Sequence, residues 1–425
     1  MEAKNVAFLT LGCKVNQYET NAMAEKFVQA GYKIIENAYE ADICVINTCS
    51  VTNMSDRKSR QMIRRVKEKN KDVMLVVTGC YAQVAKEDVS QMPEVDIVIG
   101  NNEKKDIIKY IEEKSIKMQM QDAFEPKEFA DFGTITYTEK TRASIKVQDG
   151  CDRFCSYCII PYARGRVRSR NPKSVINEIK AVAEKGIQEV VITGIHIASY
   201  GKDFKNEYKL IDLLEEINKI NEIKRIRLGS IEPTLITNEF ISRLEKLEKV
   251  CHHFHLSLQS GCDETLKRMN RRYSTYEFKQ VVERIRNAYK DAILTTDIIV
   301  GFPGETQEEF DFTYEFLKEI KFYKMHVFPY SIRKGTKAAD MPKQVDGAEK
   351  ERRSKILIEL SNKNQLEYNK KYLGQTVEVL IEEESKGHTA NYILVNVDGA
   401  EKLENKIVKV KVDNIENEFL KGSIL

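Results

Sequence analysis

The feature that most constrains the fold of this chain is the repeated alternation of short apolar runs with amphipathic segments. In the first third, the apolar runs at 6–11, 43–48, 73–78 and 96–100 are rich in Val, Ile and Leu, and we expect them to be strands. The segments at 16–30, 53–70 and 82–91 carry apolar residues at helical spacing. Such alternation is typical of a parallel sheet covered by helices on both faces. We therefore expect an N-terminal α/β domain over residues 1–115.

The alternation resumes over residues 141–370, after a stretch at 116–140 that loses periodicity and that we expect to be a linker. The expected strands are 144–147, 189–193, 225–229, 254–259, 293–301 and 325–330. A helical segment follows each of the first five, which fits a partial barrel as well as an open sheet. A charged helix is expected at 348–372. Residues 371–425 switch to period-2 strands at 377–381, 392–397 and 407–412, which predicts a small all-β module.

Composition and charge exclude several classes of protein. With 42% hydrophobic and 31% charged residues, the 425-residue chain is globular rather than disordered or collagenous. No apolar run approaches 18 residues, which excludes a membrane-spanning helix. The apolar run near the N-terminus is too short for a secretory signal peptide. We therefore expect a cytoplasmic protein that does not bind a membrane. Because the net charge is only +3, any affinity for nucleic acid must come from local basic patches.

The chain contains nine cysteines beside only six histidines. In a long chain without a secretory signal, cysteines bind metals or take part in catalysis more often than they form disulfides. Cys44, Cys251 and Cys262 have no ligand spacing, and we expect them to pack as small apolar residues. His252, His253 and His255 are expected to be ordinary structural histidines, since alternate residues on a strand share one face.

Three cysteines, Cys151, Cys155 and Cys158, lie in one short loop after the first expected strand of the second region. Strand ends are where β/α barrels collect their chemistry. Three thiols in one loop can hold one metal centre, and zinc is the first alternative. A structural zinc ion takes four ligands, and no second cysteine or histidine pair stands nearby. An iron–sulfur cluster with one open iron therefore fits better.

A second group, Cys13, Cys49 and Cys80, matches no local metal motif, but each cysteine directly follows an expected strand. The carboxyl ends of parallel strands meet at one edge of a sheet, where open α/β sheets bind ligands. Both a shared cluster and three buried thiols fit this placement.

The 151–158 loop and its surroundings resemble the radical S-adenosylmethionine (SAM) superfamily. The resemblance implies that the open iron binds SAM and that an electron from the cluster cleaves SAM to a 5′-deoxyadenosyl radical. It also implies SAM contacts at later strand ends. The implied residues are Gly194, Ser257, Gln259, Gly301, Gly304 and Glu305. For Gly301 to Glu305, a strand-to-helix turn capped by acidic residues fits as well.

Two three-cysteine sites, the first on an α/β domain ahead of a radical SAM domain, resemble the methylthiotransferase family over essentially the whole chain. The resemblance implies a central partial (β/α)6 barrel, a C-terminal TRAM-like module and two [4Fe–4S] clusters. Cys13, Cys49 and Cys80 would ligate the auxiliary cluster, and Cys151, Cys155 and Cys158 the radical cluster. One SAM would methylate sulfur, and a second would supply the radical that removes hydrogen from a C–H bond. A small electron-transfer protein is the expected reductant, and the sequence does not identify the sulfur donor.

The branches of this family differ in substrate. Residues 11–19 read LGCKVNQYE and residues 387–392 read GHTANY, which resembles the branch acting on N6-threonylcarbamoyladenosine beside the tRNA anticodon, at position 37. The branch for isopentenyl-adenosine tRNA typically has Gln-Met in place of Lys14 and Val15, and the branch for a ribosomal-protein aspartate has Pro-Lys. These two substrates are the alternatives. An alternative of another class is a non-catalytic Fe–S electron carrier or RNA-binding scaffold.

Two basic segments favour an RNA partner. Arg164, Arg166, Arg168 and Arg170 have no acid between them and follow the 151–158 loop, which makes them candidates for RNA contact. Residues 56–71 hold eight basic and two acidic side chains, and are either a solvated helix face or a second contact. Residues 371–425 hold seven lysines and ten acidic residues, which is unusual for an RNA-binding module. The ribosomal-protein substrate therefore stays open.

Overall fold

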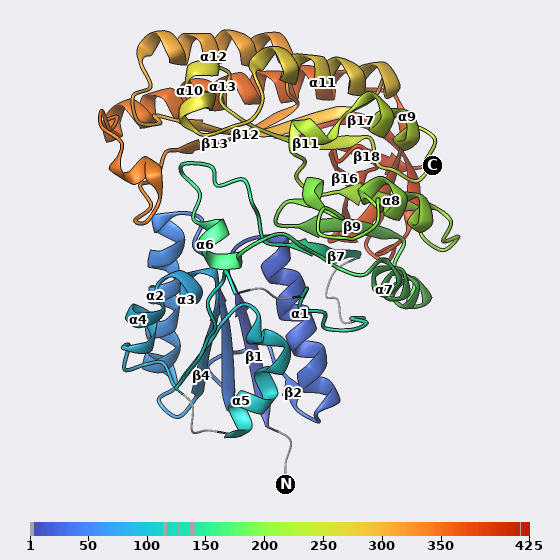
Figure 1. Ribbon diagram of the computed structural model, residues 1–425. Coiled ribbons are helices and arrows are strands. Elements are labelled where there is room, and N and C mark those ends of the chain that lie inside the picture. Colours follow the sequence, from blue (N-terminus) through green and yellow to red (C-terminus); the bar gives the residue numbers. More distant parts are fainter. Residues whose placement is uncertain (1–3, 114–116, 126–127, 137–140, 417) are drawn as a thin grey trace.

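The computed structural model describes residues 4–113, 117–125, 128–136, 141–416 and 418–425. Figure 1 shows an N-terminal α/β unit at the bottom, a curved central unit of strands and helices above it, and a small C-terminal β-barrel beside the central strands. Residues of the N-terminal unit lie directly below the central strands, so the two units share an extended interface.

The N-terminal sheet has six parallel strands in the order β2-β1-β3-β4-β5-β6. Its strands are β1 Asn5–Thr10, β2 Lys33–Ile34, β3 Ile43–Thr48, β4 Met74–Gly79, β5 Ile97–Ile99 and β6 Met118–Gln119. The four central strands overlap the expected ones. The edge strands β2 and β6 are too short to show a sequence period, and β6 falls in the stretch expected to be a linker. Because the chain steps outward to β2 and then returns to β3, the strand order reverses between β1 and β3.

Helices cover both faces of this sheet, as the alternation predicts. They are α1 Lys14–Gln29, α2 Asn53–Lys69, α3 Cys80–Val84, α4 Lys86–Ser90 and α5 Ile107–Glu113. Val45 of β3 packs with α1 and α5, while its neighbours Cys44 and Ile46 pack with α2, α3 and α4 on the other face. The buried thiol of Cys44 confirms its expected packing role. The single helix expected at 82–91 is two short helices, because Ala85 leaves helical geometry.

The central unit contains six parallel strands that follow one another in chain order. They are β7 Arg142–Asp149, β9 Glu189–Gly194, β10 Arg225–Leu228, β11 His253–Gln259, β12 Ile293–Val300 and β13 Lys324–Pro329, and β8 Arg168–Ser169 adds an antiparallel strand beside β7. β7, β9 and β10 form one sheet and β11, β12 and β13 another. Isolated parallel bridges, Ile226–Val250 and Ile231–Leu256, join the two sheets. The strands therefore curve into a partial barrel, as the family resemblance implied.

Helices cover the outer face of these strands in Figure 1. They are α7 Pro172–Glu184, α8 Leu210–Asn218, α9 Asn238–Leu244, α10 Asp263–Arg268, α11 Thr275–Ala288, α12 Gln307–Ile320 and α13 Gly347–Lys370. The short helix α6 Ile160–Arg164 instead lies against α3 of the N-terminal unit. Local sequence sets several boundaries. Ser274 and Thr306 each cap the first turn of a helix by accepting a backbone N–H three residues later, and the glutamates there bond back. Cys251 and Cys262 are buried, as expected.

The C-terminal unit is a closed barrel of five strands in the order β14-β15-β16-β18-β17. They are β14 Thr376–Glu383, β15 Lys386–Thr389, β16 Leu394–Asp398, β17 Ile407–Glu416 and β18 Phe419–Ile424. The three expected strands overlap β14, β16 and β17. β15 and β18 were missed because Gly387 and Gly422 interrupt their apolar alternation. A Cβ on either glycine would lie 2.1 Å from a carbonyl oxygen of the neighbouring strand, so the tight barrel requires both.

Polar contacts join the three units. Asn53 at the start of α2 donates to the carbonyl of Ile332 after β13, at 2.7 Å. Arg225 and Arg227 of β10 donate to carbonyls of the C-terminal barrel, those of His388 and Ala390 at 3.0 Å each. A search of the described residues finds no helix long and apolar enough to cross a lipid bilayer.

Candidate functional site

The first cysteine triad, Cys13, Cys49 and Cys80, lies where β1, β3 and β4 end. The register between these strands aligns their carboxyl ends. The reversal of strand order between β1 and β3 opens a crevice at this edge, which is where α/β sheets of this topology bind ligands. The structure therefore brings the three cysteines to the same edge.

Two glycines allow the chain segments that carry the three cysteines to pack closely against one another. A Cβ on Gly12 would lie 2.9 Å from the Cβ and 3.0 Å from the Sγ of Cys49, so the chain before Cys13 runs directly against Cys49. Gly79, before Cys80, has a φ of +101°, and a Cβ there would lie 2.3 Å from the carbonyl oxygen of Thr48. Only glycine fits at such approaches, so the Gly-Cys pairs of the sequence are packing requirements of the triad.

The electrostatic surroundings of the triad fit a negatively charged group. Burial raises the pKa of the Cys49 thiol, and the nearby Cys80 and Cys13 raise it further. Two positive features compensate. The Nε–H of Arg164 donates to the Sγ of Cys80 at 3.3 Å, and α1 begins directly after Cys13, which turns the positive end of the helix toward the triad. Three thiols beside a cation and a helix N-terminus are a donor set that fits an iron–sulfur cluster.

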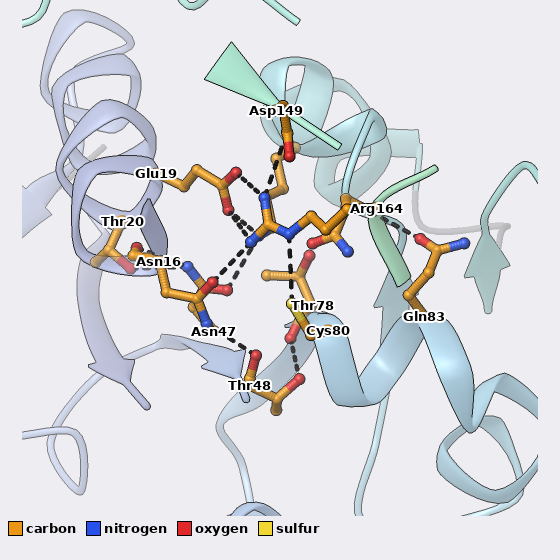
Figure 2. Close-up of polar contacts among 12 residues, drawn as sticks. Asn16, Glu19, Thr20, Asn47, Thr48, Thr78, Cys80, Gln83, Asp149 and Arg164 are labelled. Carbon is orange, nitrogen blue, oxygen red and sulfur yellow. Dashed lines mark hydrogen bonds and ion pairs between the residues drawn. The ribbon is translucent and has the colours of Figure 1, made fainter. Parts of the chain in front are cut away.

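Arg164 is the centre of a buried network between the N-terminal and central units (Figure 2). Its guanidinium pairs with Glu19 of α1 and lies 3.4 Å from a carboxylate oxygen of Asp149 in β7. Lys104 also pairs with Glu19, and Lys146 pairs with both Glu19 and Asp149 at 2.6 Å. Arg168 also lies 3.7 Å from Asp149. Four cations therefore face two carboxylates, which leaves the network with a net positive charge beside the triad.

The carboxylates of this network are held ionised. Burial alone would raise the pKa of Glu19, but Arg164, Lys104 and Lys146 outweigh it and hold this pKa well below its usual range. The same competition lowers the pKa of Asp149 to about 2, with Lys146 the strongest of the cations. Both acids are therefore charged at neutral pH, and each removal of a partner leaves a buried charge uncompensated.

The expectation that four arginines contact RNA is wrong for three of them. Arg164, Arg168 and Arg170 are buried, with exposed fractions of 1%, 6% and 0%. Arg170 pairs with Glu178 at 2.6 Å and with Asp131 at 3.0 Å. Both acids lie outside the segment 164–170, so the sequence of that segment shows no acidic partner. Arg166 alone stays exposed, beside Asp152 at 3.3 Å, and can still reach RNA.

The second triad, Cys151, Cys155 and Cys158, occupies the loop after β7. Burial raises the pKa of Cys151 to about 11 and that of Cys158 to about 12. Arg271 donates to the Sγ of Cys155 at 3.3 Å and to the carbonyl of Ser257 at 3.0 Å, which ties the loop to β11. An arginine thus accompanies a thiol in each triad. Within the described parts of the chain, no three His, Cys, Asp or Glu side chains are placed to hold a single metal ion, so the fit rests on the thiol chemistry.

The six residues expected to bind SAM lie at the ends of β9, β11 and β12. Gly194 closes β9 and approaches the carbonyl of Gln148 so nearly that a Cβ would lie 2.9 Å from it. Ser257 and Gln259 close β11, and Gln259 has a φ of +72°. Gly301, Gly304 and Glu305 form the turn after β12.

The turn after β12 also has structural contacts of its own. The Glu305 carboxylate accepts the Gly301 N–H at 2.9 Å and pairs with Arg353 of α13 at 2.5 Å. These contacts support the interpretation of this segment as a capped turn, and they occupy the Glu305 carboxylate.

A cavity of about 600 Å³ lies at the junction of the three units. Cys13 and Lys14 contribute from the N-terminal unit, and Gly194 contributes from the end of β9. The rest of the wall comes from β10 to β13, from α13 and from the C-terminal barrel. The residues on this part of the wall include Arg227, Gly229, His253, His255, Thr295, Lys324, His326, His388 and Tyr392. One space therefore connects the first triad with a strand end expected to bind SAM.

Stacked rings form one wall of this cavity. The Tyr392 ring lies between His253 and His388, with centroid distances of 4.8 and 4.5 Å. Arg227 and Arg142 cover the same ring at 4.6 and 5.2 Å. The sequence singled out the segment with Tyr392 only by its resemblance to a family branch. Arg227 was missed, because it lies inside an apolar strand pattern and its partner Glu189 is on another strand.

The three histidines that invited a metal assignment have ordinary partners. His253 and His255 both hydrogen-bond the Thr295 hydroxyl at 3.0 Å, and His252 bonds Asp291 at 2.7 Å. Burial lowers the pKa of His253 well below its usual value, so this ring is neutral.

Three family models match the chain. They are the Radical SAM superfamily over residues 145–317, the Uncharacterized protein family UPF0004 over residues 5–100, and the TRAM domain over residues 370–425. The solved radical S-adenosylmethionine methyltransferase TsrM from Kitasatospora setae has a similar fold, with a TM-score of 0.58 over 80% of this chain and 77% of that chain, at 14% identity.

Curated relatives match over nearly the full length. A threonylcarbamoyladenosine tRNA methylthiotransferase MtaB from Bacillus subtilis (strain 168) is 43% identical over 96% of this chain and 93% of its own. A protein of the same name from Aquifex aeolicus (strain VF5) is 41% identical over 96% of this chain and 100% of its own. A tRNA-2-methylthio-N(6)-dimethylallyladenosine synthase from Caldicellulosiruptor saccharolyticus is 36% identical over 99% of this chain and 93% of its own.

The partial barrel with its cysteine loop and the match to the superfamily model define a radical SAM enzyme. The chain belongs to the radical SAM methylthiotransferase family. Membership implies a [4Fe–4S] cluster and SAM as cofactors.

Proposed function

We propose that this chain is a tRNA methylthiotransferase that converts N6-threonylcarbamoyladenosine at position 37 to its 2-methylthio derivative. The names of the relatives from Bacillus subtilis and Aquifex aeolicus support this substrate, and so does Lys14-Val15 after Cys13. The enzyme acts in the cytoplasm and receives electrons from a small electron-transfer protein.

The observation that carries the proposal is the shared cavity. A methylthio transfer needs the substrate carbon to meet both a sulfur source and the radical formed from SAM. Cys13 of one triad and Gly194 at the end of β9 border the same space. We assign the auxiliary [4Fe–4S] cluster to Cys13, Cys49 and Cys80, and the radical cluster to Cys151, Cys155 and Cys158.

When bound, the two clusters and SAM supply methyl transfer to sulfur and radical removal of the substrate hydrogen. The residues of this chain hold the two cysteine triads in place and enclose the cavity. Arg164 and Arg271 each donate a charge-assisted hydrogen bond to one triad, at Cys80 and Cys155. His388 and Tyr392 of the C-terminal barrel wall the cavity and limit the entry of water.

The exposed face of α2 is the proposed tRNA-binding surface. Side chains of α2 itself line a hollow of about 690 Å³ on this face. They are Arg57, Arg60, Gln61, Arg64, Arg65, Glu68 and Lys69. Ile63 and Val66 turn inward to the sheet, which leaves the arginines on the outer face, where they can contact phosphates. Arg60 also donates to the Tyr81 hydroxyl at 3.0 Å, and Arg64 lies 3.9 Å from Glu94. Because α2 belongs to the N-terminal unit, nucleic acid bound to this face would be held by the same unit that carries the first triad. The acidic C-terminal barrel then contributes to the cavity rather than to most of the phosphate binding.

Nucleoside mass spectrometry of tRNA from a strain lacking this gene tests the substrate. We expect the 2-methylthio form to disappear and N6-threonylcarbamoyladenosine to accumulate, with restoration by the wild-type gene but not by its Cys13→Ser variant. An unchanged methylthio content rejects the proposal. Loss of a methylthio group from isopentenyl-adenosine or from a ribosomal protein instead would identify one of the other two branches.

A non-catalytic Fe–S protein would behave differently. The reconstituted, reduced protein should release 5′-deoxyadenosine from SAM if it is a radical enzyme. Absence of that product would favour an electron carrier or an RNA-binding scaffold.

A further inference from the structure

The charge of the cavity wall is one-sided. Lys14, Arg227 and Lys324 supply three cationic side chains, and no aspartate or glutamate is among the described residues that line the cavity. A pocket walled by cations without acids favours an anionic group on its ligand, because charge complementarity selects the partner. The question is which cation is available to such a group.

Two of the three guanidinium nitrogens of Arg227 are already engaged, and its buried Nη2 has no hydrogen-bond partner among the described residues. Its Nε lies 2.7 Å from Glu189, and its Nη1 donates to the carbonyl of Ala390 at 3.0 Å. Lys14 has no hydrogen bond or ion pair with any residue that the structure describes. Its charged or ionisable neighbours are Tyr392, Arg142, Arg227 and Glu189, and the Glu189 carboxylate pairs with Arg227. The Lys14 side chain is exposed to the space of the cavity. A lysine ammonium that faces a cavity without a partner is ready to bind an anion.

The position of Lys14 links this charge to the reaction. Lys14 directly follows Cys13, and both line the same cavity. A substrate base held near the first triad therefore brings its N6 substituent within the region that Lys14 can reach. The threonylcarbamoyl substituent ends in a carboxylate, whereas an isopentenyl substituent is an uncharged hydrocarbon.

We propose that Lys14 is the residue that selects the threonylcarbamoyl substrate, by pairing its ammonium with the carboxylate of the threonyl group. This inference rests on the proposed function. A charge-assisted hydrogen bond of this kind discriminates because a substrate without the carboxylate leaves the ammonium unpaired. Lys324 on β13 is a second cation on the wall with no hydrogen bond or ion pair to the residues that the structure describes, and it serves as the comparison.

The test compares two tRNA substrates, one with the natural threonyl carboxylate and one with that carboxylate converted to a methylamide. For the wild-type enzyme, we expect kcat/KM to fall by about 10- to 100-fold on the methylamide, mainly through KM. The Lys14→Gln variant should treat the two substrates alike, and Lys14→Arg should restore much of the preference. Lys33→Gln, on the exposed edge strand β2, is the matched control and should keep the wild-type preference.

Three further readouts separate other anions that Lys14 could bind. Uncoupled release of 5′-deoxyadenosine and the affinity for SAM should be unchanged in Lys14→Gln, because a change in either would indicate contact with the SAM carboxylate. Affinity for tRNA without the threonylcarbamoyl group should also be unchanged, since a loss there would indicate a phosphate contact. Iron content should match that of the wild type, and a loss would indicate a role in holding the cluster. Each of these contrary results overturns the assignment.

Retention of the carboxylate preference by Lys14→Gln would also overturn the inference. Loss of the preference in Lys324→Gln alone would place the carboxylate on β13 instead. If the wild-type enzyme modifies neither substrate, the proposed function has failed rather than the role of Lys14.

Discussion

The Nε–H of Arg164, at the end of α6 in the central unit, donates to the Sγ of Cys80 in the N-terminal unit across 3.3 Å. The same guanidinium pairs with Glu19 and donates to Asn16 of α1 at 2.7 Å. One side chain thus fixes the position of the first triad relative to the barrel. Its burial means that the link is shielded from water and salt.

Replacing Arg164 tests this link. Arg164→Met would leave Glu19 with two cations in place of three and remove the donor to Cys80. We expect the free energy of unfolding to fall by about 3–5 kcal/mol, because one partner of a buried charge network is lost. Urea unfolding measures this effect. Arg166→Met is the matched control, since 63% of the Arg166 side chain is exposed and its loss should cost less than about 0.5 kcal/mol.

Glu19 predicts an acid-sensitive interface. Its pKa is held well below the usual value in the folded chain, so its contribution to stability is present above the pKa of the unfolded state, about 4.3, and is lost as pH falls toward the folded value. Glu19→Gln should therefore flatten the dependence of unfolding free energy on pH below about 4.3. Denaturant unfolding at a series of pH values measures the slope. The same substitution at exposed Glu112 of α5 should leave the slope unchanged.

The two triads predict a divided iron content. Changing Cys151, Cys155 and Cys158 together to Ala should leave about half of the iron, because the other triad is on a separate unit. Changing Cys13, Cys49 and Cys80 should remove the other half. Iron and sulfide analysis of the reconstituted protein gives the result. Loss of all the iron, or of none, in either variant contradicts two independent clusters.

The basic face of α2 predicts salt-sensitive tRNA binding. The double variant Arg64→Glu, Arg65→Glu should bind tRNA at least ~10-fold more weakly at low salt, and its affinity should depend less steeply on salt concentration. Filter binding or fluorescence anisotropy at several salt concentrations measures both. Lys33→Glu with Lys109→Glu makes the same charge change at exposed sites on β2 and α5. Equal weakening by both double variants would indicate only the general charge of the molecule.

Gly79 predicts a steric requirement next to the triad. Gly79→Ala would place a Cβ 2.3 Å from the Thr48 carbonyl at a φ of +101°, so we expect a loss of more than about 2 kcal/mol of stability. Gly31→Ala is the matched control. Gly31 has a φ of +85° but no atom within 4 Å of the added Cβ, so it reports the backbone strain alone, about 1 kcal/mol. Similar losses in both variants would show that the close approach of Gly79 to Thr48 is not required.

Sequence periodicity predicted the parts of the fold that have long apolar runs. The strands before Cys49 and Cys80 are buried on both faces, so their apolar pattern is continuous, whereas β1 before Cys13 is only partly buried. The grouping of the three strand ends follows from parallel pairing. The two-residue strands β2 and β6 have no period to detect, and glycines conceal β15 and β18.

The charged residues were predictable only where their partners are local. Arg164 seemed free because its partner Glu19 is 145 residues away in the chain. The role of Arg227 could not be predicted for the same reason, since Glu189 and the C-terminal barrel contact it only in the folded molecule. Lys14 was noticed as a mark of one family branch, but its place in the cavity depends on docking of all three units.

The cavity wall that Tyr392 completes has a consequence for how the protein is made. Cys13 and Lys14 are synthesised well before Tyr392, although all three line the same cavity in the folded chain. During synthesis, the edge of the N-terminal sheet is therefore exposed to solvent until the C-terminal barrel has been made. Iron and sulfide carriers can reach the first triad in that interval without passing any part of the finished wall. In the completed chain, Cys13 instead faces the cavity that the C-terminal barrel helps to enclose.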